Sequence, residues 1–459
     1  MERNHRSAER AYKTSSSSSL VLNPSKSLSS TLLIAHPRTV PTGVQDIPYE
    51  LIEHTISHLH DDNASLSACA VVCKLWTTPS HRFLFDTLRV IAGTDHQRLR
   101  QFADFVPSSK FACQGVRHFS LSHSPDTALH ATDFEGPPSA DFDLSLLTSL
   151  LSKMDRLESL AIAQACWKGS SISSILDEPK IHLPFLTKLS IGPFPFFHKI
   201  YHIQIIFDWF PSLRQLSIHE GILVDPQIVM EEAFTYPAQA RKLSTPTALR
   251  LTTLDYRAFI YANFFVQSIS RTLSTQSLRF ISARITSRQS VMGIGDLLRI
   301  VGPVLEDLRL DLQFLFEEMT DVNSVARFNE DWILLSNKCL AVLRSLTLTI
   351  STCTAHSNGI HSTGVLLLPL LLETIESPHF RRFKLVFGGY EESTLGYIDL
   401  GNDWSSTEVQ LLRLKTLERV EFGYTPTSKF IEPDPISDVI HDRLKAVLPT
   451  LASKNLLHR

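Results

Sequence analysis

A short apolar motif recurs ten times after residue 115, and it limits the possible folds of this chain more than any other feature. Each copy has the form apolar-x-x-apolar-x-apolar. The residues at the centre of the copies are Phe119, Leu160, Leu189, Leu216, Leu254, Ile281, Leu308, Leu346, Phe383 and Val420. From Leu160 onward they follow one another at steps of 29, 27, 38, 27, 27, 38, 37 and 37 residues. Alternating apolar residues at such steps predict short strands that bury one side in a shared interior.

The recurrence predicts an α/β fold of the solenoid type, in which short parallel strands alternate with helical return legs. Steps of 27 to 29 residues resemble leucine-rich repeats of the longer kind, and the longer steps would carry loop insertions. The Asn or Cys that usually turns the chain after such a strand is mostly missing. The predicted repeat is therefore irregular, and an irregular α/β domain is the alternative. Expected helical legs cover residues 144–154, 203–210, 294–301, 332–343 and 366–375.

A different pattern occupies residues 46–90, where two short amphipathic helices are expected to enclose an Asp-Asp-Asn turn. Asp46 is a plausible N-cap, and Pro48 suits a helix start because its missing N–H costs nothing there. Ser65 is the expected cap of the second helix, which Pro79 should end. A third short element follows. The segment has more apolar surface than about 45 residues can bury alone, and such a surplus usually marks a docking site.

The residues of this segment resemble an F-box. The resemblance rests on Ile47-Pro48-Tyr49-Glu50-Leu51-Ile52, Leu59, Val72-Cys73-Lys74-Leu75-Trp76 and Phe83-Leu84-Phe85. The one departure is Ile47, where the family usually has Leu. The whole chain is similar to the F-box proteins of mushroom-forming (basidiomycete-type) fungi, in which a degenerate leucine-rich region follows the F-box.

This resemblance implies a substrate-recognition adaptor that is not itself an enzyme. The F-box would bind a Skp-type adaptor protein and through it a cullin–RING ubiquitin ligase, while the repeat domain would hold an unknown target protein. The residues implied in binding the Skp-type partner are Ile47, Pro48, Leu51, Ile52, Val72 and Trp76. The alternative function is a scaffold that binds a Skp-type partner without directing ubiquitination. The resemblance implies residence in the cytoplasm, the nucleus or both.

The sequence divides into three predicted regions. Residues 1–43 are Ser-rich and lack the aromatic side chains of a core, so a disordered tail is expected. Residues 44–92 form the all-helical F-box module, and residues 93–459 form the irregular leucine-rich-repeat-like solenoid. The amphipathic stretch after Pro435 is expected to be a helix that caps the end of the solenoid.

Strand residues between the buried positions should line one face of the solenoid, and basic residues gather there near the C-terminal end. Arg381, Arg382 and Lys384 are the candidate target-binding residues, because Arg can hold a phosphate with two hydrogen bonds. The alternative is that they pair with acidic residues of neighbouring strands, such as Glu418 and Glu421.

Other classes of chemistry lack a specific sequence signal. His54 and His58 lie one turn apart without a third ligand at a fixed spacing, and Cys69 and Cys73 lack a partner pair, so no metal site or cofactor is expected. Gly293 and Gly295 do not complete a phosphate loop. An enzyme with an unrecognised site is a third interpretation. The six Cys have no disulfide spacing, the net charge of −3 argues against a nucleic-acid binder, and no apolar run is long enough to span a membrane.

Overall fold

The computed structural model describes part of the chain. The tail expected at 1–43, the expected N-cap Asp46 and most of the helical leg expected at 203–210 lie outside the described residues. The described residues are 47–92, 97–123, 144–163, 166–167, 183–192, 196–197, 209–219, 249–257, 269, 273–274, 276–285, 288–312, 339–351, 363–389, 394–395, 398, 403–426 and 438–458. The chain divides into two units after Leu51. Each unit is considered by itself.

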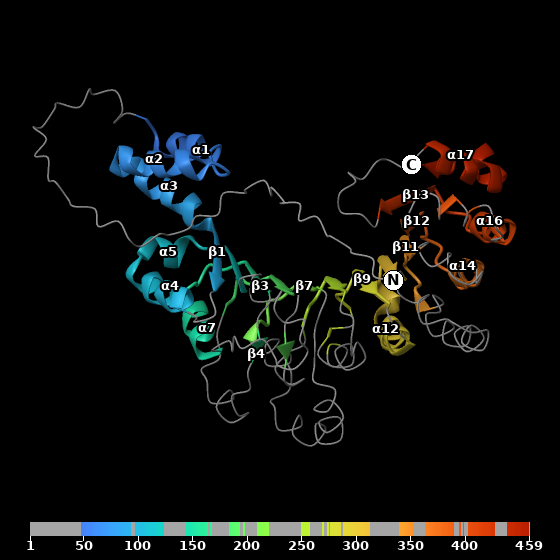
Figure 1. The fold of residues 1–459 in the computed structure, drawn as a ribbon, viewed down its shortest axis with the longest axis horizontal. Coiled ribbons are helices and arrows are strands. Elements are labelled where there is room, and N and C mark those ends of the chain that lie inside the picture. Colours follow the sequence, from blue (N-terminus) through green and yellow to red (C-terminus); the bar gives the residue numbers. More distant parts are fainter. Residues whose placement is uncertain are drawn as a thin grey trace, which may run out of the picture. The chain divides into compact units, whose positions relative to one another are not determined.

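Twelve parallel strands make up the main sheet, and they follow one another in chain order (Figure 1). The strands are β1 (Thr87–Ala92), β2 (His118–His123), β3 (Ser159–Ala163), β5 (Lys188–Ile191), β7 (Gln215–Ile218), β8 (Thr253–Tyr256), β9 (Phe280–Arg284), β10 (Asp307–Asp311), β11 (Ser345–Ser351), β12 (Arg382–Gly389), β13 (Arg419–Pro426) and β14 (Leu457–His458). A second, two-stranded sheet pairs β4 (Cys166–Trp167) with β6 (Phe196–Phe197). All ten apolar motifs coincide with strands β2 to β13 of the main sheet, so the α/β class and the parallel strands are confirmed.

The motif determines the register of the sheet. The central motif residue of each strand lies opposite that of the next, from Phe119 in β2 through Leu308 in β10 to Val420 in β13. These side chains are buried, as are the apolar residues two positions later, such as Leu310 and Phe422. They belong to one continuous hydrophobic core that runs from Leu99 to Leu451. A one-residue slip would turn every buried side chain outward, which is why the alternation fixes the pairing.

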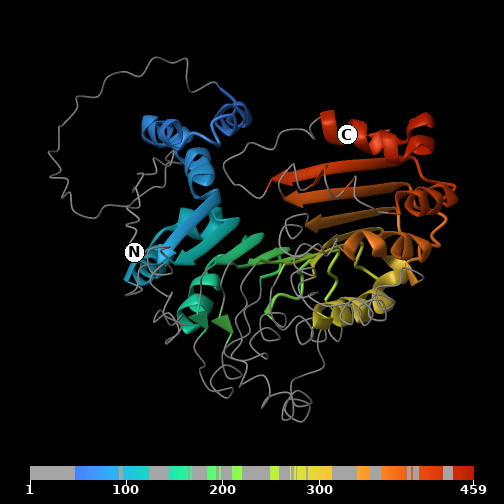
Figure 2. The same ribbon diagram turned by 45° about the vertical axis from the view of Figure 1, so that its right-hand side comes forward.

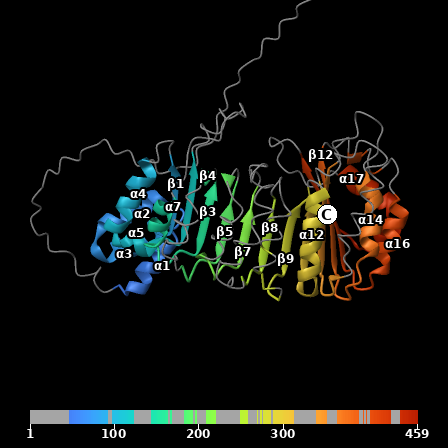
Figure 3. The same ribbon diagram turned by 90° about the horizontal axis from the view of Figure 1, so that it is seen from below.

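Helices are described in the connections β1–β2, β2–β3, β9–β10, β11–β12, β12–β13 and β13–β14 of the main sheet. These helices are α4 (Gln97–Ser108), α5 (Lys110–Gly115), α7 (Leu144–Leu151), α12 (Arg288–Val301), α14 (Thr363–Glu373), α16 (Trp404–Arg413), α17 (Asp438–Val447) and α18 (Pro449–Ser453). Figure 2 shows α12, α14 and α16 along one side of the neighbouring strands, and Figure 3 shows the same strands from below. The predicted legs 144–154, 294–301 and 366–375 are helical for most of their length. In the leg 332–343, the described residues 339–343 form turns instead of an α-helix.

The C-terminal segment ends against the last long strand. The helix expected after Pro435 is present as α17 and α18, and the chain then adds β14 beside β13. The Glu408 carboxylate of α16 accepts a hydrogen bond of 2.8 Å from the backbone N–H of Leu451 in α18. Because Glu408 is buried, this bond joins two helices from inside the core.

The predicted helical module, residues 44–92, reaches into the sheet. Its last six residues are β1, which pairs with β2. The turn before β2 packs against the helix that precedes β1, since the Arg117 N–H donates to the Asp86 carbonyl at 2.9 Å. A Cβ on Gly115 would lie 3.2 Å from the Phe85 Cβ. The helices of the segment therefore continue directly into the sheet.

Gly192 follows β5 with a φ of +139°, where L side chains are strained. A Cβ there would lie 2.6 Å from the Cβ of His219. Gly192→Ala is therefore expected to lower the free energy of unfolding by about 1–3 kcal/mol. Urea denaturation measures the change, and Ser190→Ala in β5 is the control, expected within about 0.5 kcal/mol of the unmodified chain. Equal stability of both variants would contradict this account of Gly192.

His441 in α17 makes the stability of the C-terminal segment depend on pH. Burial lowers the pKa of its imidazole below the ordinary 6.5, Lys445 lowers it further, and Asp442 opposes the shift. The unfolded chain therefore takes up the proton more readily than the folded chain does. Folding is expected to lose stability as the pH falls from about 7 to 5, with a slope of at most about 1.4 kcal/mol per pH unit from this residue.

His441→Gln is expected to reduce that slope. The measurement is urea denaturation of both chains at pH 7.5 and at pH 5.5. An identical loss of stability in the two chains would show that His441 is not the titrating group.

Candidate docking surfaces

Three short helices form the segment that resembles an F-box: α1 (Tyr49–Ser57), α2 (Asn63–Val72) and α3 (Lys74–Asp86). In the unit that begins at Ile52, they share a small core of Ile52, Ile56 and Leu66, each at most 2% exposed. The residues packed against this core are Leu59, Trp76, Phe83 and Leu84. This core is separate from the long core under the sheet.

The turn between α1 and α2 is held by Asp62. Its carboxylate accepts hydrogen bonds from the backbone N–H of Ala64 at 3.0 Å and of Ser65 at 3.1 Å, and from the Ser65 hydroxyl at 2.6 Å. The bonds from Ser65 lower the pKa of Asp62 most. The N-cap of α2 is therefore Asp62, and the prediction that Ser65 is the cap was wrong, because the hydroxyl donates to the carboxylate instead.

The junction between α2 and α3 also differs from the prediction. Helix α2 ends at Val72, Cys73 takes an extended backbone, and a new helix begins at Lys74 and contains Pro79. The Thr77 hydroxyl lies 2.8 Å from the Ala70 carbonyl and 3.0 Å from that of Cys73. The side chain of Thr77 thus satisfies a carbonyl that the end of α2 leaves open. The prediction that Pro79 ends a helix was wrong, since the break falls at Cys73.

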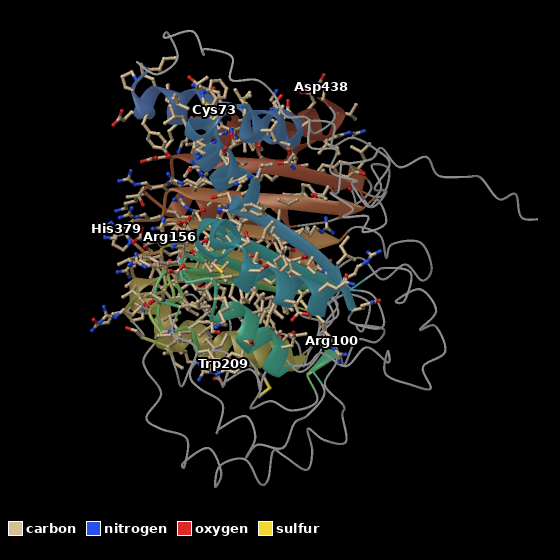
Figure 4. All side chains as sticks on the ribbon, turned by 90° about the vertical axis from the view of Figure 1, so that its left-hand side faces the viewer. Cys73, Arg100, Arg156, Trp209, His379 and Asp438 are labelled. Atoms are coloured by element: carbon tan, nitrogen blue, oxygen red, sulfur yellow. The ribbon has the colours of Figure 1, made fainter. Side chains whose placement is uncertain are left out.

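Three large apolar side chains are exposed around this junction. Val71 is 84% exposed, Val72 64% and Leu75 42%. Cys73, which lies between them, is labelled in Figure 4. Elsewhere in the described part of this unit, exposed large apolar residues occur singly along the sequence, as with Val409. Three within five residues make this the densest exposed apolar stretch described in the unit that begins at Ile52, and Val72 is one of the predicted partner contacts.

The first described residues of the chain form a second exposed apolar stretch, which belongs to the N-terminal unit. Ile47 and Tyr49 are each 41% exposed and Leu51 is 55% exposed, and Pro48 is exposed as well. The Leu51 N–H donates to the Pro48 carbonyl at 3.0 Å, which is the first turn of α1. The predicted contacts Ile47, Pro48 and Leu51 are thus all accessible.

The remaining two predicted contacts lie differently. Ile52 is 2% exposed and belongs to the small core, so its side chain does not reach the surface. Trp76 packs half-buried against the same core. Its indole N–H is buried and has no acceptor among the described residues. Of the six predicted contacts, Ile52 is therefore a core residue, and Trp76 packs mainly against the core.

A row of charged residues and threonines runs along the edge of the sheet where the strands begin. It consists of the first x of each apolar-x-x-apolar-x-apolar motif, and every member is Arg, Glu or Thr. The members are Arg117, Glu158, Thr187, Arg214, Thr252, Arg279, Glu306, Arg344, Arg381 and Glu418. From Glu158 onward, the backbone N–H of each member donates to the carbonyl of the member before it. Figure 4 labels Arg156 and His379, which lie close to this edge.

Ion pairs link several neighbours in this edge row. Arg117 lies 3.7 Å from Glu158, and Glu306 lies 3.6 Å from Arg279 and 3.3 Å from Arg344. The predicted target-binding residue Arg381 pairs with Glu418 at 3.4 Å. Sequence reasoning missed the row, although the restriction of one motif position to Arg, Glu and Thr was a readable signal.

Arg382 and Lys384 lie in a different group, which we call the Glu421 cluster: Arg382, Lys384, Arg419 and Glu421. The Glu421 carboxylate is 2.9 Å from Arg419, 3.4 Å from Lys384 and 3.5 Å from Arg382. The register explains the grouping, since Arg382 lies opposite Arg419 and Lys384 opposite Glu421. The predicted trio is thus divided: Arg381 belongs to the edge row, and Arg419 takes its place here.

The described residues contain no group of three or more His, Cys, Asp and Glu side chains that could hold a metal ion. The Nε2 atoms of His54 and His58 are 3.4 Å apart on an exposed helix face. No described helix has the length and apolar character needed to cross a membrane.

No family model matches the chain, and no curated protein matches it either.

Proposed function

We propose that this chain is a non-catalytic substrate-recognition adaptor of a cullin–RING ubiquitin ligase of the SCF type. The observation that carries the proposal is the exposure of Val71, Val72 and Leu75 within a stretch whose sequence resembles an F-box. A small domain that leaves such residues in water usually covers them in a complex. The partner that this sequence pattern implies is a Skp-type adaptor.

In this proposal the parallel sheet and its helices are an irregular leucine-rich-repeat-like solenoid that holds the target protein. Twelve strands in chain order, with helices along one side, support that description. The ligase subunits that join the adaptor would transfer ubiquitin, and this chain would raise the local concentration of target lysines near them. Such a role places the chain in the cytoplasm, the nucleus or both.

A second candidate function uses the same exposed stretch. The chain would then be a scaffold that binds a Skp-type partner and never meets a cullin. The same observation favours it, since exposed apolar residues require a partner but do not determine what else that partner binds.

Reconstitution separates the two functions. The full chain is mixed with a purified Skp-type adaptor, a cullin–RING core, ubiquitin, its activating and conjugating enzymes and ATP. The adaptor function predicts a complex that contains the cullin and ubiquitin conjugates on the chain or on proteins bound to it. A chain that binds the Skp-type adaptor but leaves the cullin unbound and ubiquitin unconjugated would contradict the adaptor function and favour the scaffold.

A further inference from the structure

Two imidazole rings converge where α1 ends. His54 lies in the last turn of α1 and His58 follows four residues later, so both occupy the same side of the helix. Their Nε2 atoms are 3.4 Å apart, while the ring centroids are 4.7 Å apart and the ring planes make an angle of 73°. Both side chains are exposed. The two ring nitrogens therefore meet at a point that solvent can reach.

The separation of the Nε2 atoms fits two ligands of one metal ion. Imidazole nitrogens bind Zn²⁺ at about 2.0–2.1 Å, so two of them on one tetrahedral ion are about 3.4 Å apart. A well-formed hydrogen bond from a ring N–H would be shorter, at about 3.0 Å. A neutral imidazole that carries its proton on Nδ1 has an open lone pair on Nε2, which is the form that binds metals.

The surroundings of the pair favour a cation. The carbonyl end of a helix carries a partial negative charge, and α1 ends at Ser57. Asp61 and Asp62 follow in the next turn. The third imidazole of this region, His60, is engaged elsewhere, since its Nδ1 is 3.0 Å from the Ser57 carbonyl oxygen and its Nε2 is 3.0 Å from the Asp61 carboxylate. Convergence is thus a property of His54 and His58, and His60 is a neighbour without it.

We propose that His54 and His58 bind one divalent transition-metal ion through their Nε2 atoms, with water in the remaining coordination positions. The sequence-based prediction that no metal site exists rested on the missing third ligand. That argument excludes a closed site, and the described residues contain no group of three possible ligands. An open site needs only two converging imidazoles. The inference goes beyond the proposed function and does not depend on it.

An ion in this place would stabilise the folded form of the segment. It would link two successive turns of the chain, and the two imidazoles converge only when α1 is folded. Helix α1 also supplies Ile52 and Ile56 to the small core that it shares with Leu66 of α2. A ligand that binds only the folded form shifts the folding equilibrium toward it. The metal ion is therefore expected to make the three-helix segment more resistant to urea.

Chelation by two residues has a distinctive consequence for variants. His54→Gln or His58→Gln leaves a single imidazole, so either substitution is expected to weaken binding of the ion by about 100-fold. Because the two ligands act as a unit, the double variant is expected to lose little more than each single variant. Imidazoles that bound ions independently would instead give losses that add.

The experiment is isothermal titration calorimetry of Ni²⁺ into the full chain without an affinity tag. Imidazole is a favoured ligand of Ni²⁺, whereas thiolates select other metals, so the cysteines contribute little to the signal. His60→Gln is the matched control, because it removes an exposed imidazole from the same region and leaves the pair in place. Circular dichroism shows that each variant is folded, and urea denaturation is run with and without Ni²⁺.

The expected result is one tightly bound Ni²⁺ in the unmodified chain and in His60→Gln, lost to the same extent in His54→Gln, His58→Gln and the double variant. Added Ni²⁺ should raise the urea midpoint only in the two chains that keep the pair, and EDTA should reverse the change. Affinity for Ni²⁺ that is unchanged in the double variant would overturn the proposal. Losses that add, or an equal loss in His60→Gln, would overturn it as well.

Discussion

Val72→Asp is expected to weaken binding of the full chain to a Skp-type adaptor by roughly 100-fold. Val72 is 64% exposed at the end of α2, so the substitution leaves the small core of the segment intact. In the proposed complex the Val72 side chain is buried. A carboxylate placed there would lose the apolar contact, and its desolvation would cost free energy because no partner compensates the charge. Isothermal titration calorimetry with purified adaptor measures the change.

Val409→Asp is a closely matched control. Val409 is 61% exposed on α16, far from the F-box-like segment in the sequence, and the substitution is chemically identical. The affinity of the Val409→Asp variant for the adaptor is expected to equal that of the unmodified chain. Equal weakening by both substitutions would point to a general effect of added charge and would contradict a docking surface at Val72.

Leu346→Ala is expected to lower the free energy of unfolding by about 2–5 kcal/mol. Leu346 is fully buried in β11, between Leu308 of β10 and Phe383 of β12. Strands on both sides pin the site, so it has little freedom to collapse around the cavity that the substitution leaves. Chemical denaturation followed by circular dichroism measures the loss.

Thr347→Ala provides the comparison for Leu346→Ala. Thr347 is the next residue on the same strand and points to the outward face, so its substitution is expected to change stability by less than about 0.5 kcal/mol. If both substitutions cost the same, the alternation that places Leu346 in the core and Thr347 outside it would be wrong.

The strands were predictable from the sequence because the same alternation both marks and fixes them. Ten copies of one motif became ten strands whose central residues lie side by side. The end strands β1 and β14 lack the full motif, since β1 continues from α3 and β14 has only two residues. Their places depend on packing against the neighbouring strand, which the sequence does not show locally.

The helix boundaries in the F-box-like segment were harder to predict because small hydrogen-bonding groups decide them. Asp62 rather than Ser65 caps α2, and at the break at Cys73 the Thr77 hydroxyl donates to the Ala70 carbonyl. Apolar spacing carries no information on either choice. The same limit applies to Ile52, whose helical position did not show that its side chain faces the core.

The candidate target-binding residues were predicted as a run in the sequence, whereas the structure groups them by register. Arg381 precedes β12 and enters the edge row, and Arg382 begins the strand and faces Arg419. Adjacent residues of a strand point to opposite sides, and partners come from the next strand. Only the register brings Arg419 and Glu421 to Arg382 and Lys384.

Binding of the unmodified full chain to a purified Skp-type adaptor tests the central claim most directly. The measurement is size-exclusion chromatography with light scattering, run beside the Pro48→Ala/Leu51→Ala double variant. The account predicts a one-to-one complex for the unmodified chain and separate elution for the double variant. A folded, unmodified chain that elutes apart from the adaptor at micromolar concentrations would contradict the adaptor function.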